Sequence, residues 1–300
     1  MKTPLVVSVI LNSNRRDDTL ACLSSLEQNS YANRRTIVLD NASSDGSVDA
    51  VRTSFPGVQI IELDQNLGYA GNNDVGIKAA MDQGADWVFV LNEDTILAPD
   101  CLEKLVAVGE SEPAIGIVGP LVYHHDEPEV IQSAGGKMNR FFQGWHRGQN
   151  EPDHGQYDHP EPVDWITGCG IMVRREVIEQ VGAIDERFFY YVEEFEWCIR
   201  TKKSGWKIFF APQAKLWHKG VQRNYQPKPS IMYYLTRNRL FLLYKHHASF
   251  ITWLVTWSEL LRTLISWTVR PKWRSKTAYR NAMWHGMVDF LNRRWGQMPQ

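Results

Sequence analysis

The sequence predicts an α/β protein built on a doubly wound, mostly parallel sheet. Short apolar runs, typical of buried parallel strands, alternate with segments of helical periodicity over about the first 120 residues. The clearest run, 87–91, leads directly into Asn92, Glu93 and Asp94. Ligands of open α/β sheets bind at the carboxyl ends of the strands, so this turn is expected at the mouth of a crevice. Oxygen ligands placed there suit a divalent cation.

The elements follow in chain order. A first strand is expected over 6–11, and then a helix that Asp17 or Asp18 caps. Further strands are expected over 36–39, 58–63, 87–92 and 115–118, with helices near Ser47, over 71–81 and from Pro99 or Asp100. Residues 124–162 are rich in Gly, Pro, His and Asp, which predicts excursion loops or a short antiparallel flap. We expect a strand over 163–173, a helix over 193–204 and a strand over 206–210 that ends before Pro212.

Composition restricts the class of protein. A chain of 300 residues can bury a substantial core. Its four cysteines have neither CxxC nor zinc spacing, which favours a reduced, cytoplasmic protein. The apolar run 5–11 is short and has no small-residue cleavage site after it, so we expect no signal peptide.

A net charge of −1 conceals a strong asymmetry along the chain. From Lys215 onward there are 15 Lys and Arg residues against only Glu259 and Asp289, whereas residues 1–214 carry 18 basic and 32 acidic groups. Seven of the 12 tryptophans also follow position 214. An acidic body with a basic, Trp-rich tail indicates that the tail meets an anionic surface.

From Ile231 the pattern becomes helical, and the segment 250–270 is strongly amphipathic. Its polar residues recur at steps of three and four on one narrow stripe: Thr252, Thr256, Glu259, Thr263, Ser266 and Arg270. Charged residues interrupt it, so a helix lying in the membrane interface fits better than a spanning one. Two interpretations stay open: the apolar face lies on a membrane, or it packs on the catalytic domain or a second subunit.

Two loops carry further chemistry. Asp40 opens the segment DNASSDGS, where its carboxylate could accept a hydrogen bond from a nucleobase, although an ordinary Asp/Gly turn is the alternative. The segment NLGYAGNNDVG at 66–76 has three glycines and three asparagines at a helix start, which suits a ribose or a pyrophosphate. Neither GxGxxG nor GxxxxGK[ST] occurs, which argues against a nicotinamide enzyme.

These segments, in this order, resemble the family-2 inverting glycosyltransferases with the GT-A fold, in particular rhamnosyltransferase-like bacterial members. The resemblance covers most of residues 4–218 and rests on the opening strand, DNASSDGS, NLGYAGNND, LNEDTILAPD, the stretch 166–206 that begins ITGCGIMVRREVIEQVG, and APQAKLWH. It implies a catalytic domain at 1–218, with a nucleotide-sugar half at about 1–122 and an acceptor half at about 123–218. Residues 219–300 would then form a basic, Trp-rich helical extension.

The resemblance also implies roles for matching positions. Asp94 matches the metal-binding aspartate, and His218 matches a histidine near the metal or the diphosphate. Gly168 and Cys169 match the acceptor-side segment, and Arg237 matches a segment that could grip the diphosphate of the donor or of a lipid carrier. A solvated helix face is the alternative for Arg237. The residues expected around the nucleotide sugar are Asn12, Asn14, Asp40, Asn66, Gly68, Asn73, Asn92, Glu93, Gly168, Cys169 and Arg237.

Glu194 stands where the family's Glu-Asp pair has its catalytic aspartate, with Glu193 just before it. A glutamate keeps the carboxylate and lengthens its arm by one methylene, so a base role survives. Whether Glu193 or Glu194 is the base stays open. Beside the apolar 188–191 segment, the base is expected to have a raised pKa.

The resemblance implies an enzyme that transfers a sugar, rhamnose as the best guess, from a nucleoside-diphosphate sugar with Mg²⁺ or Mn²⁺. The acceptor is expected to be a hydroxyl of a bacterial cell-surface glycan or of a lipid-linked glycan. We expect the protein at the inner face of the cell membrane, as a peripheral enzyme and potentially a homodimer, with no nucleic-acid partner. Galactofuranosyl or N-acetylhexosaminyl transfer is the alternative within the fold. A sugar-nucleotide nucleotidyltransferase would need a Gly-rich basic loop after the first strand, and Asn12 and Asn14 stand there instead, which argues against that class of enzyme. The alternative of another class is a non-catalytic nucleotide-binding or membrane scaffold.

Overall fold

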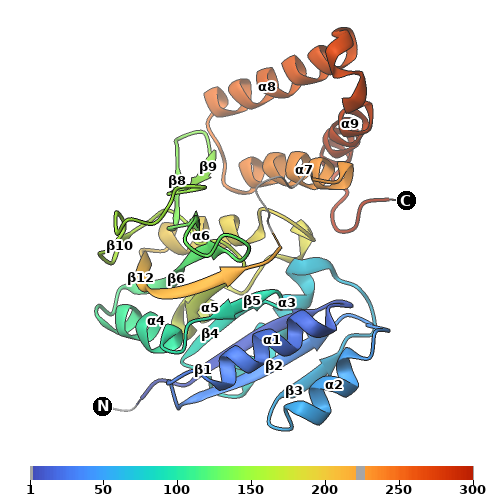
Figure 1. Ribbon diagram of the computed structural model, residues 1–300. Helices are drawn as coiled ribbons and strands as arrows, with labels where there is room; N and C mark the ends of the chain where they lie inside the picture. The colour runs from blue at the N-terminus through green and yellow to red at the C-terminus, as the bar shows by residue number, and fades with distance from the viewer. Residues whose placement is uncertain (1–2, 221–226, 300) are drawn as a thin grey trace.

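The computed structural model describes residues 3–220 and 227–299; positions 221–226 of the predicted extension lie outside it. A large mixed sheet forms the centre, with strand order β10-β12-β6-β11-β4-β1-β2-β3. Helices cover both of its faces and three further helices stand at one end of the molecule (Figure 1). The prediction of an α/β fold is confirmed.

The amino-terminal half of the sheet is parallel. Its strands are β1 (Val6–Asn12), β2 (Arg34–Asp40), β3 (Gln59–Glu62) and β4 (Trp87–Asn92). They pair in parallel in the order β3-β2-β1-β4. All of the predicted strands in this region are present, and their carboxyl ends meet at one edge, as expected.

Alternate residues of these strands build two separate cores. Val7 and Val9 face α3 (Gly68–Asp82), whereas Val6 and Ile10 face α1 (Arg16–Glu27) and α4 (Cys101–Glu110). The strands are therefore buried on both faces, which explains why they read as continuous apolar runs. The short helix α2 (Ser47–Ser54) covers the sheet's β2–β3 edge beside α1 (Figure 1).

The second half of the sheet is mixed. It contains β5 (Thr95–Leu97), β6 (Ile115–His124), β7 (Ile131–Ser133), β10 (Glu161–Pro162), β11 (Gly170–Arg174) and β12 (Lys207–His218). β11 runs antiparallel to both β4 and β6. The segment β8 (Gly136–Met138) and β9 (Gly144–His146) forms a separate antiparallel hairpin, which confirms the predicted flap. Three helical segments lie between β11 and β12 in the chain: α5 (Arg175–Val181), the single turn η1 (Glu186–Phe188) and α6 (Glu193–Lys203).

Three predictions of boundaries were wrong. The strand expected over 163–173 is only β11, because a turn in which the Gly170 N–H donates to Thr167 interrupts the run. The strand expected to stop before Pro212 continues to His218, because Pro212 falls in a register shift where the ladder is already broken. Neither predicted aspartate caps α1; Asp45 accepts from the Arg16 N–H instead.

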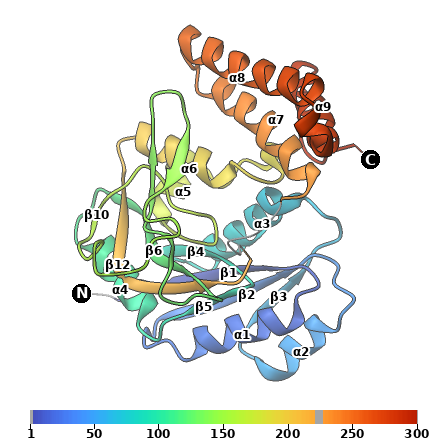
Figure 2. The ribbon, with the colours of Figure 1, turned by 45° about the horizontal axis from the view of Figure 1, so that its top comes forward.

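The carboxyl-terminal region is helical, with α7 (Pro229–Lys245), α8 (Phe250–Val269), the turn η2 (Pro271–Lys276) and α9 (Thr277–Leu291). α7 lies next to the catalytic body, and α8 is the outermost element in both views (Figures 1 and 2). None of the helices in the described ranges is long and apolar enough to traverse a bilayer.

Candidate active site

The ends of β1, β2 and β4 bring the first predicted residues together. Asn12 is in register with Asp40, and Leu11 is in register with Asn92. The Asn12 side-chain amide donates to Asp40 Oδ1 at 2.7 Å. Asp40 and Asn12 are almost fully buried, so they form the floor of this edge.

The loops after β1 and β2 hold one another in place. Asn14 adopts a left-handed backbone with φ of 53°, and its side-chain oxygen accepts from the Ser44 N–H at 2.8 Å. Asp40 Oδ2 accepts from the Ser43 N–H at 2.9 Å. Asp40 therefore organises the DNASSDGS loop around the point where a nucleobase is expected.

The turn after β4 carries the acidic centre. His218, at the end of β12, places Nε2 3.1 Å from Asp94 Oδ1 and 3.4 Å from the Asn92 amide nitrogen. Gln132 lies 3.0 Å from the other ring nitrogen of His218 and so fixes the orientation of the ring. The antiparallel pairing of β5 with β12 brings His218 opposite Thr95 and explains the contact.

The two carboxylates of this turn have different ionisation. Burial and then the neighbouring charge of Asp94 raise the pKa of Glu93 to about 7. Burial opposes ionisation of Asp94 as well, yet its contacts with His218 and Arg15 hold its pKa below the usual value. Arg15 lies 3.6 Å from Asp94 and 3.9 Å from Glu93, so a cation already faces the acidic turn.

The donor atoms around Asp94 fit a divalent cation. Among residues 3–220 and 227–299 the buried side-chain oxygen of Asn92 has no hydrogen-bond donor, and Asp94 Oδ1 has only its contact with His218, which adds a nitrogen. Within the same ranges no three His, Cys, Asp or Glu side chains are grouped closely enough to hold a metal by themselves. Mg²⁺ and similar ions are commonly held by one or two carboxylates together with substrate phosphates, so the arrangement is suited to a metal that arrives with a diphosphate.

Glu194 lies on the other side of the 167–169 turn. The Cys169 carbonyl accepts from the Asn92 N–H at 3.2 Å, and a Cβ built on Gly168 would lie 3.6 Å from Glu194 Cγ. The Tyr69 hydroxyl donates to the Gly168 carbonyl at 2.8 Å and completes this side of the site. The turn therefore connects the acidic centre with the glutamate pair.

The glutamate pair is held protonated at a higher pH than usual. Burial and then the charge of Glu194 raise the pKa of Glu193 well above its normal value, and burial raises that of Glu194. Each has a buried carboxylate oxygen without a hydrogen-bond partner in the described part of the chain. Glu193 is 4% exposed whereas Glu194 is more accessible, so Glu194 is better placed to meet a substrate.

A strained segment positions this pair. Phe189, Tyr191 and Val192 all have left-handed backbone conformations, with φ between 63° and 77°. Such conformations cost about 1–3 kcal/mol each and persist only where the surroundings enforce them. Here the Asn238 side-chain amide on α7 donates to the carbonyls of Phe188, Tyr190 and Tyr191.

Two predicted donor ligands, Arg237 and Asn73, are wholly buried, and their contact with the donor stays a prediction. The Arg237 guanidinium donates to the carbonyls of Phe188 and Gly296. Asn73 is also 0% exposed and donates to the Tyr69 carbonyl within α3. Both side chains support the packing around the site.

The loop 66–68 also packs against the strained segment. Asn66 accepts from the Gly68 N–H, and Gly68 has φ of +73°. A side chain at Gly68 would lie 2.4 Å from the Phe189 carbonyl oxygen. Glycine is therefore required because this loop touches the strained segment, which the sequence alone did not indicate.

Sequence reasoning did not identify Arg15, Tyr69, Gln132 or Asn238. Arg15 follows Asn14 directly, so its place in the loop after the first strand was an available signal. Gln132 and Asn238 act through residues 86 and about 50 positions away, respectively, and no local pattern marks them.

Comparisons with solved structures define the class of protein. The fold matches a mannosyltransferase from Pyrobaculum calidifontis, solved with GDP-mannose and Mn²⁺, with a TM-score of 0.62 and 15% identity over 97% of this chain and 88% of that one. It also matches Staphylococcus aureus TarS residues 1–349, with a TM-score of 0.62 and 13% identity over 97% and 82% of the two chains. The fold is GT-A, that of nucleotide-sugar glycosyltransferases.

The sequence then gives the family. Residues 7–182 match the model of glycosyl transferase family 2, and the chain belongs to this family and is a nucleotide-sugar-dependent glycosyltransferase. It is 28% identical to the N-acetylglucosaminyl-diphospho-decaprenol L-rhamnosyltransferase of Mycobacterium tuberculosis, over 78% of this chain and 79% of that protein. It is 26% identical to the dTDP-rhamnosyl transferase RfbF of Shigella flexneri, over 82% of each chain.

Proposed function

We propose that this enzyme transfers rhamnose, with inversion, from a nucleoside-diphosphate sugar to a hydroxyl of a lipid-linked glycan of the bacterial surface. The names of the M. tuberculosis and S. flexneri relatives support rhamnose as the sugar, and the first name supports a diphospho-lipid acceptor. The structural support is the shared site: Asp40, Asp94 and Glu194, distant in sequence, are connected through Asn12, Asn92 and the 167–169 turn.

Glu194 is the proposed base. Its carboxylate takes the proton of the acceptor hydroxyl while the acceptor oxygen forms a bond to the anomeric carbon. The bond from that carbon to the diphosphate oxygen breaks, and the nucleoside diphosphate leaves with the electron pair. Attack from the side opposite the leaving group inverts the anomeric centre. Tyr69 and Gly168 fix the Glu194 side of the proposed site.

Asp94 and His218 would hold a Mg²⁺ or Mn²⁺ ion, which supplies positive charge to the departing diphosphate when bound. Arg15 adds a cation of the chain's own, because it already lies beside Asp94 and Glu93. Asp40, Asn12 at the end of β1 and Asn14 in the loop that follows would receive the nucleobase at the floor of the same edge. Asn92 and Glu93 complete the donor side.

Galactofuranose is the second candidate sugar, since the chain is also 29% identical to the galactofuranosyltransferase GlfT1 of M. tuberculosis over 68% of its length and 66% of that protein. N-acetylhexosamine stays an alternative on the fold. The division into a catalytic domain at 1–218 and an extension at 219–300 stays our proposal, and so does a location at the inner face of the cell membrane. A homodimer remains a prediction.

Donor hydrolysis and transfer to a polyprenyl-diphospho-N-acetylglucosamine acceptor would test the proposal, with dTDP-rhamnose, UDP-galactofuranose and UDP-N-acetylglucosamine compared in the presence of Mn²⁺. We expect transfer of rhamnose alone and an inverted product by NMR. Preferred transfer from either UDP-sugar would overturn the sugar assignment. Absence of transfer from all three donors, with nucleotide binding intact, would overturn the acceptor assignment.

A further inference from the structure

Helix α8 displays its apolar face to solvent. Phe250, Leu254, Leu261, Ile265 and Val269 recur on one side of the helix and are between 48% and 81% exposed. The opposite side holds Thr252 and Thr256, which are buried. A surface helix of a soluble domain normally has the reverse orientation, so the exposed face calls for a partner.

Polar contacts on the inward side fix this orientation. Glu259 accepts from Arg239 of α7 at 2.9 Å and from Gln143 of the β8–β9 hairpin at 2.9 Å. Rotation of α8 to bury its apolar face would break both contacts and leave the Glu259 carboxylate without these two hydrogen-bond donors. Packing of this face on the catalytic domain, one of the interpretations left open by the sequence, does not apply to the five exposed residues, because the polar stripe occupies that interface.

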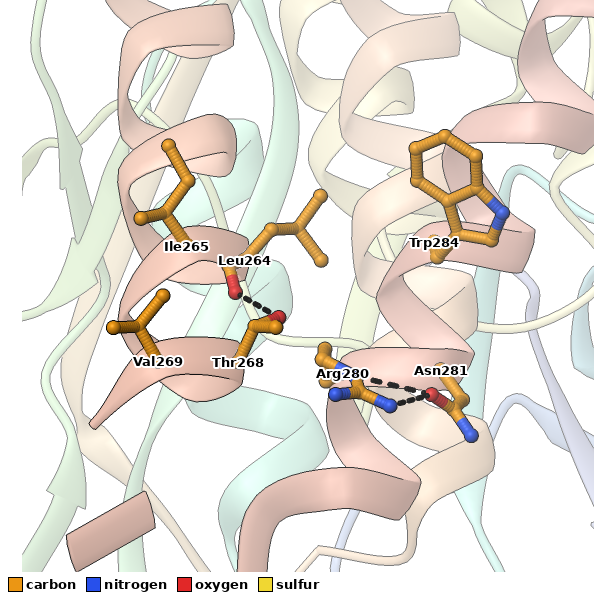
Figure 3. Close-up of a pocket in the computed structure, with 7 residues that line it drawn as sticks. All are labelled: Leu264, Ile265, Thr268, Val269, Arg280, Asn281 and Trp284. Atoms are coloured by element: carbon orange, nitrogen blue, oxygen red, sulfur yellow. Dashed lines mark hydrogen bonds between the residues drawn. The ribbon is translucent and has the colours of Figure 1, made fainter. Parts of the chain in front are cut away.

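The apolar face continues into an open groove between α8 and α9. The groove encloses roughly 450 Å³ (Figure 3). Leu264, Ile265, Val269 and Trp284 provide apolar surface, and Arg280 and Asn281 lie at one end. Figure 3 shows Arg280 directed toward Asn281, whose side-chain oxygen accepts from Arg280 Nη2 at 2.8 Å. Such a groove can take an acyl chain with a phosphate held at the Arg280 end.

Cations occur along this helix pair and the turn that connects it. Six of them occur between positions 260 and 288, a stretch without an acidic residue: Arg262, Arg270, Lys272, Arg274, Lys276 and Arg280. In the described ranges none of the six makes an ion pair, because this region has no acidic residue. Cations elsewhere in the protein do pair with nearby carboxylates. Trp273 lies among them in η2 and is of the residue type that favours a membrane interface.

We propose that the α8 face, the α8–α9 groove and these six cations together form a docking surface for an anionic phospholipid bilayer. The exposed apolar stripe enters the acyl region while the six cations meet lipid phosphates. A second copy of this chain is a poorer occupant, because a two-fold contact would oppose the two sets of unpaired cations. Docking on a bilayer would bring the active site close to the proposed lipid-linked acceptor. Only this link to the acceptor rests on the proposed function.

The test is flotation of the full-length protein with vesicles of phosphatidylglycerol and phosphatidylcholine, without donor or acceptor, so it is independent of transfer. We expect binding to vesicles with phosphatidylglycerol and little binding to phosphatidylcholine alone. Lys272→Gln with Arg274→Gln should weaken the binding more than tenfold, at roughly fivefold per cation. Leu261→Ser with Ile265→Ser should do likewise, and both pairs should keep the wild-type thermal unfolding because the residues are exposed or half-exposed.

The matched control is Arg35→Gln with Arg52→Gln, which removes the same charge from β2 and α2. If the control pair weakens binding as much as the η2 pair, general charge attraction explains it and the surface is overturned. If Leu261→Ser with Ile265→Ser leaves vesicle binding unchanged, the proposed surface is also overturned. A stable dimer in solution that Leu261→Ser with Ile265→Ser dissociates, without vesicle binding, would assign the face to a second copy.

Discussion

The side-chain amide of Asn238 donates to the carbonyl of Tyr191 at 2.7 Å, which ties α7 to the segment just before the glutamate pair. The same amide also donates to Phe188 and Tyr190. The extension thus contributes the group that keeps three left-handed residues in place, and the geometry of Glu193 and Glu194 depends on it.

Replacement of Asn238 by Leu is therefore expected to lower kcat about 10–100-fold while the Kd for nucleotide stays unchanged. Loss of the three hydrogen bonds that this amide donates should cost about 3 kcal/mol of unfolding free energy, at about 1 kcal/mol each. Thr236→Val is the matched control, because it removes a hydrogen bond of a buried side chain on the same helix, to the Met232 carbonyl, that does not involve the segment. Equal losses of kcat in both variants would show that stability, not positioning, is responsible.

The accessible member of the glutamate pair should carry the chemistry. Glu194→Gln removes the base and keeps the volume, so we expect kcat to fall about 10²–10⁴-fold, with nucleotide affinity retained. Glu193→Gln should reduce kcat by less than tenfold, because Glu193 is the more buried of the two. Steady-state kinetics with calorimetric nucleotide binding distinguishes them, and the reverse ranking would assign the base to Glu193.

Glu193 should also make stability depend on pH. Its pKa is raised in the folded protein by burial and by Glu194, with Tyr69 of α3 close to both. The folded state then binds more protons than the unfolded state, so stability falls as pH rises above the unfolded value near 4.5. Glu193→Gln should raise Tm at pH 8, by about 2–4 °C per kcal/mol gained, with little effect near pH 4. A constant difference across this range would contradict the assignment.

Gln132 should affect the donor site through His218 alone. Gln132→Leu removes the partner of the ring nitrogen that faces away from Asp94. Comparable changes beside metal ligands cost 10–100-fold in metal affinity, so we expect that rise in the Mn²⁺ concentration for half-maximal nucleotide binding. Gln180→Leu, which alters an exposed contact with Trp206, is the control. An unchanged Mn²⁺ requirement would exclude His218 from the cation site.

The sequence was informative where side-chain chemistry coincides with the end of a buried strand. Asp40, Asn92 and Asp94 follow apolar runs, so parallel pairing alone brings them to one edge. The contacts of Arg237 could not be predicted, because α7 is buried on most sides and the sequence does not distinguish a cation that faces solvent from one that donates to backbone carbonyls. The direction of α8 was equally hidden, since Gln143 and Glu259, which set it, are 116 residues apart.

Glu196 provides the last prediction, because it joins α6 to the extension with no access to solvent. Its carboxylate lies 2.9 Å from Arg200, 2.9 Å from Lys245 and 3.1 Å from His246. Burial opposes ionisation, yet these partners keep its pKa below the usual value. Its contribution to stability is therefore present above the unfolded pKa and is lost as pH falls through the folded one.

Glu196→Gln should cost about 1.5–3 kcal/mol at pH 7, because it removes the charge that Arg200 and Lys245 contact, although Lys245 keeps its pair with Asp185. The loss should shrink as the pH approaches the folded pKa of Glu196, the opposite trend to that of Glu193. Glu179→Gln breaks an exposed pair with Arg175 on α5 and should cost less than about 1 kcal/mol. Lys245 is the last residue of α7 and His246 caps it. The Glu196 variant should therefore also loosen the extension, which hydrogen exchange in α7 and α8 would detect. Unaltered exchange there would mean that other contacts, such as those of Asn238, suffice to hold the extension on the catalytic body.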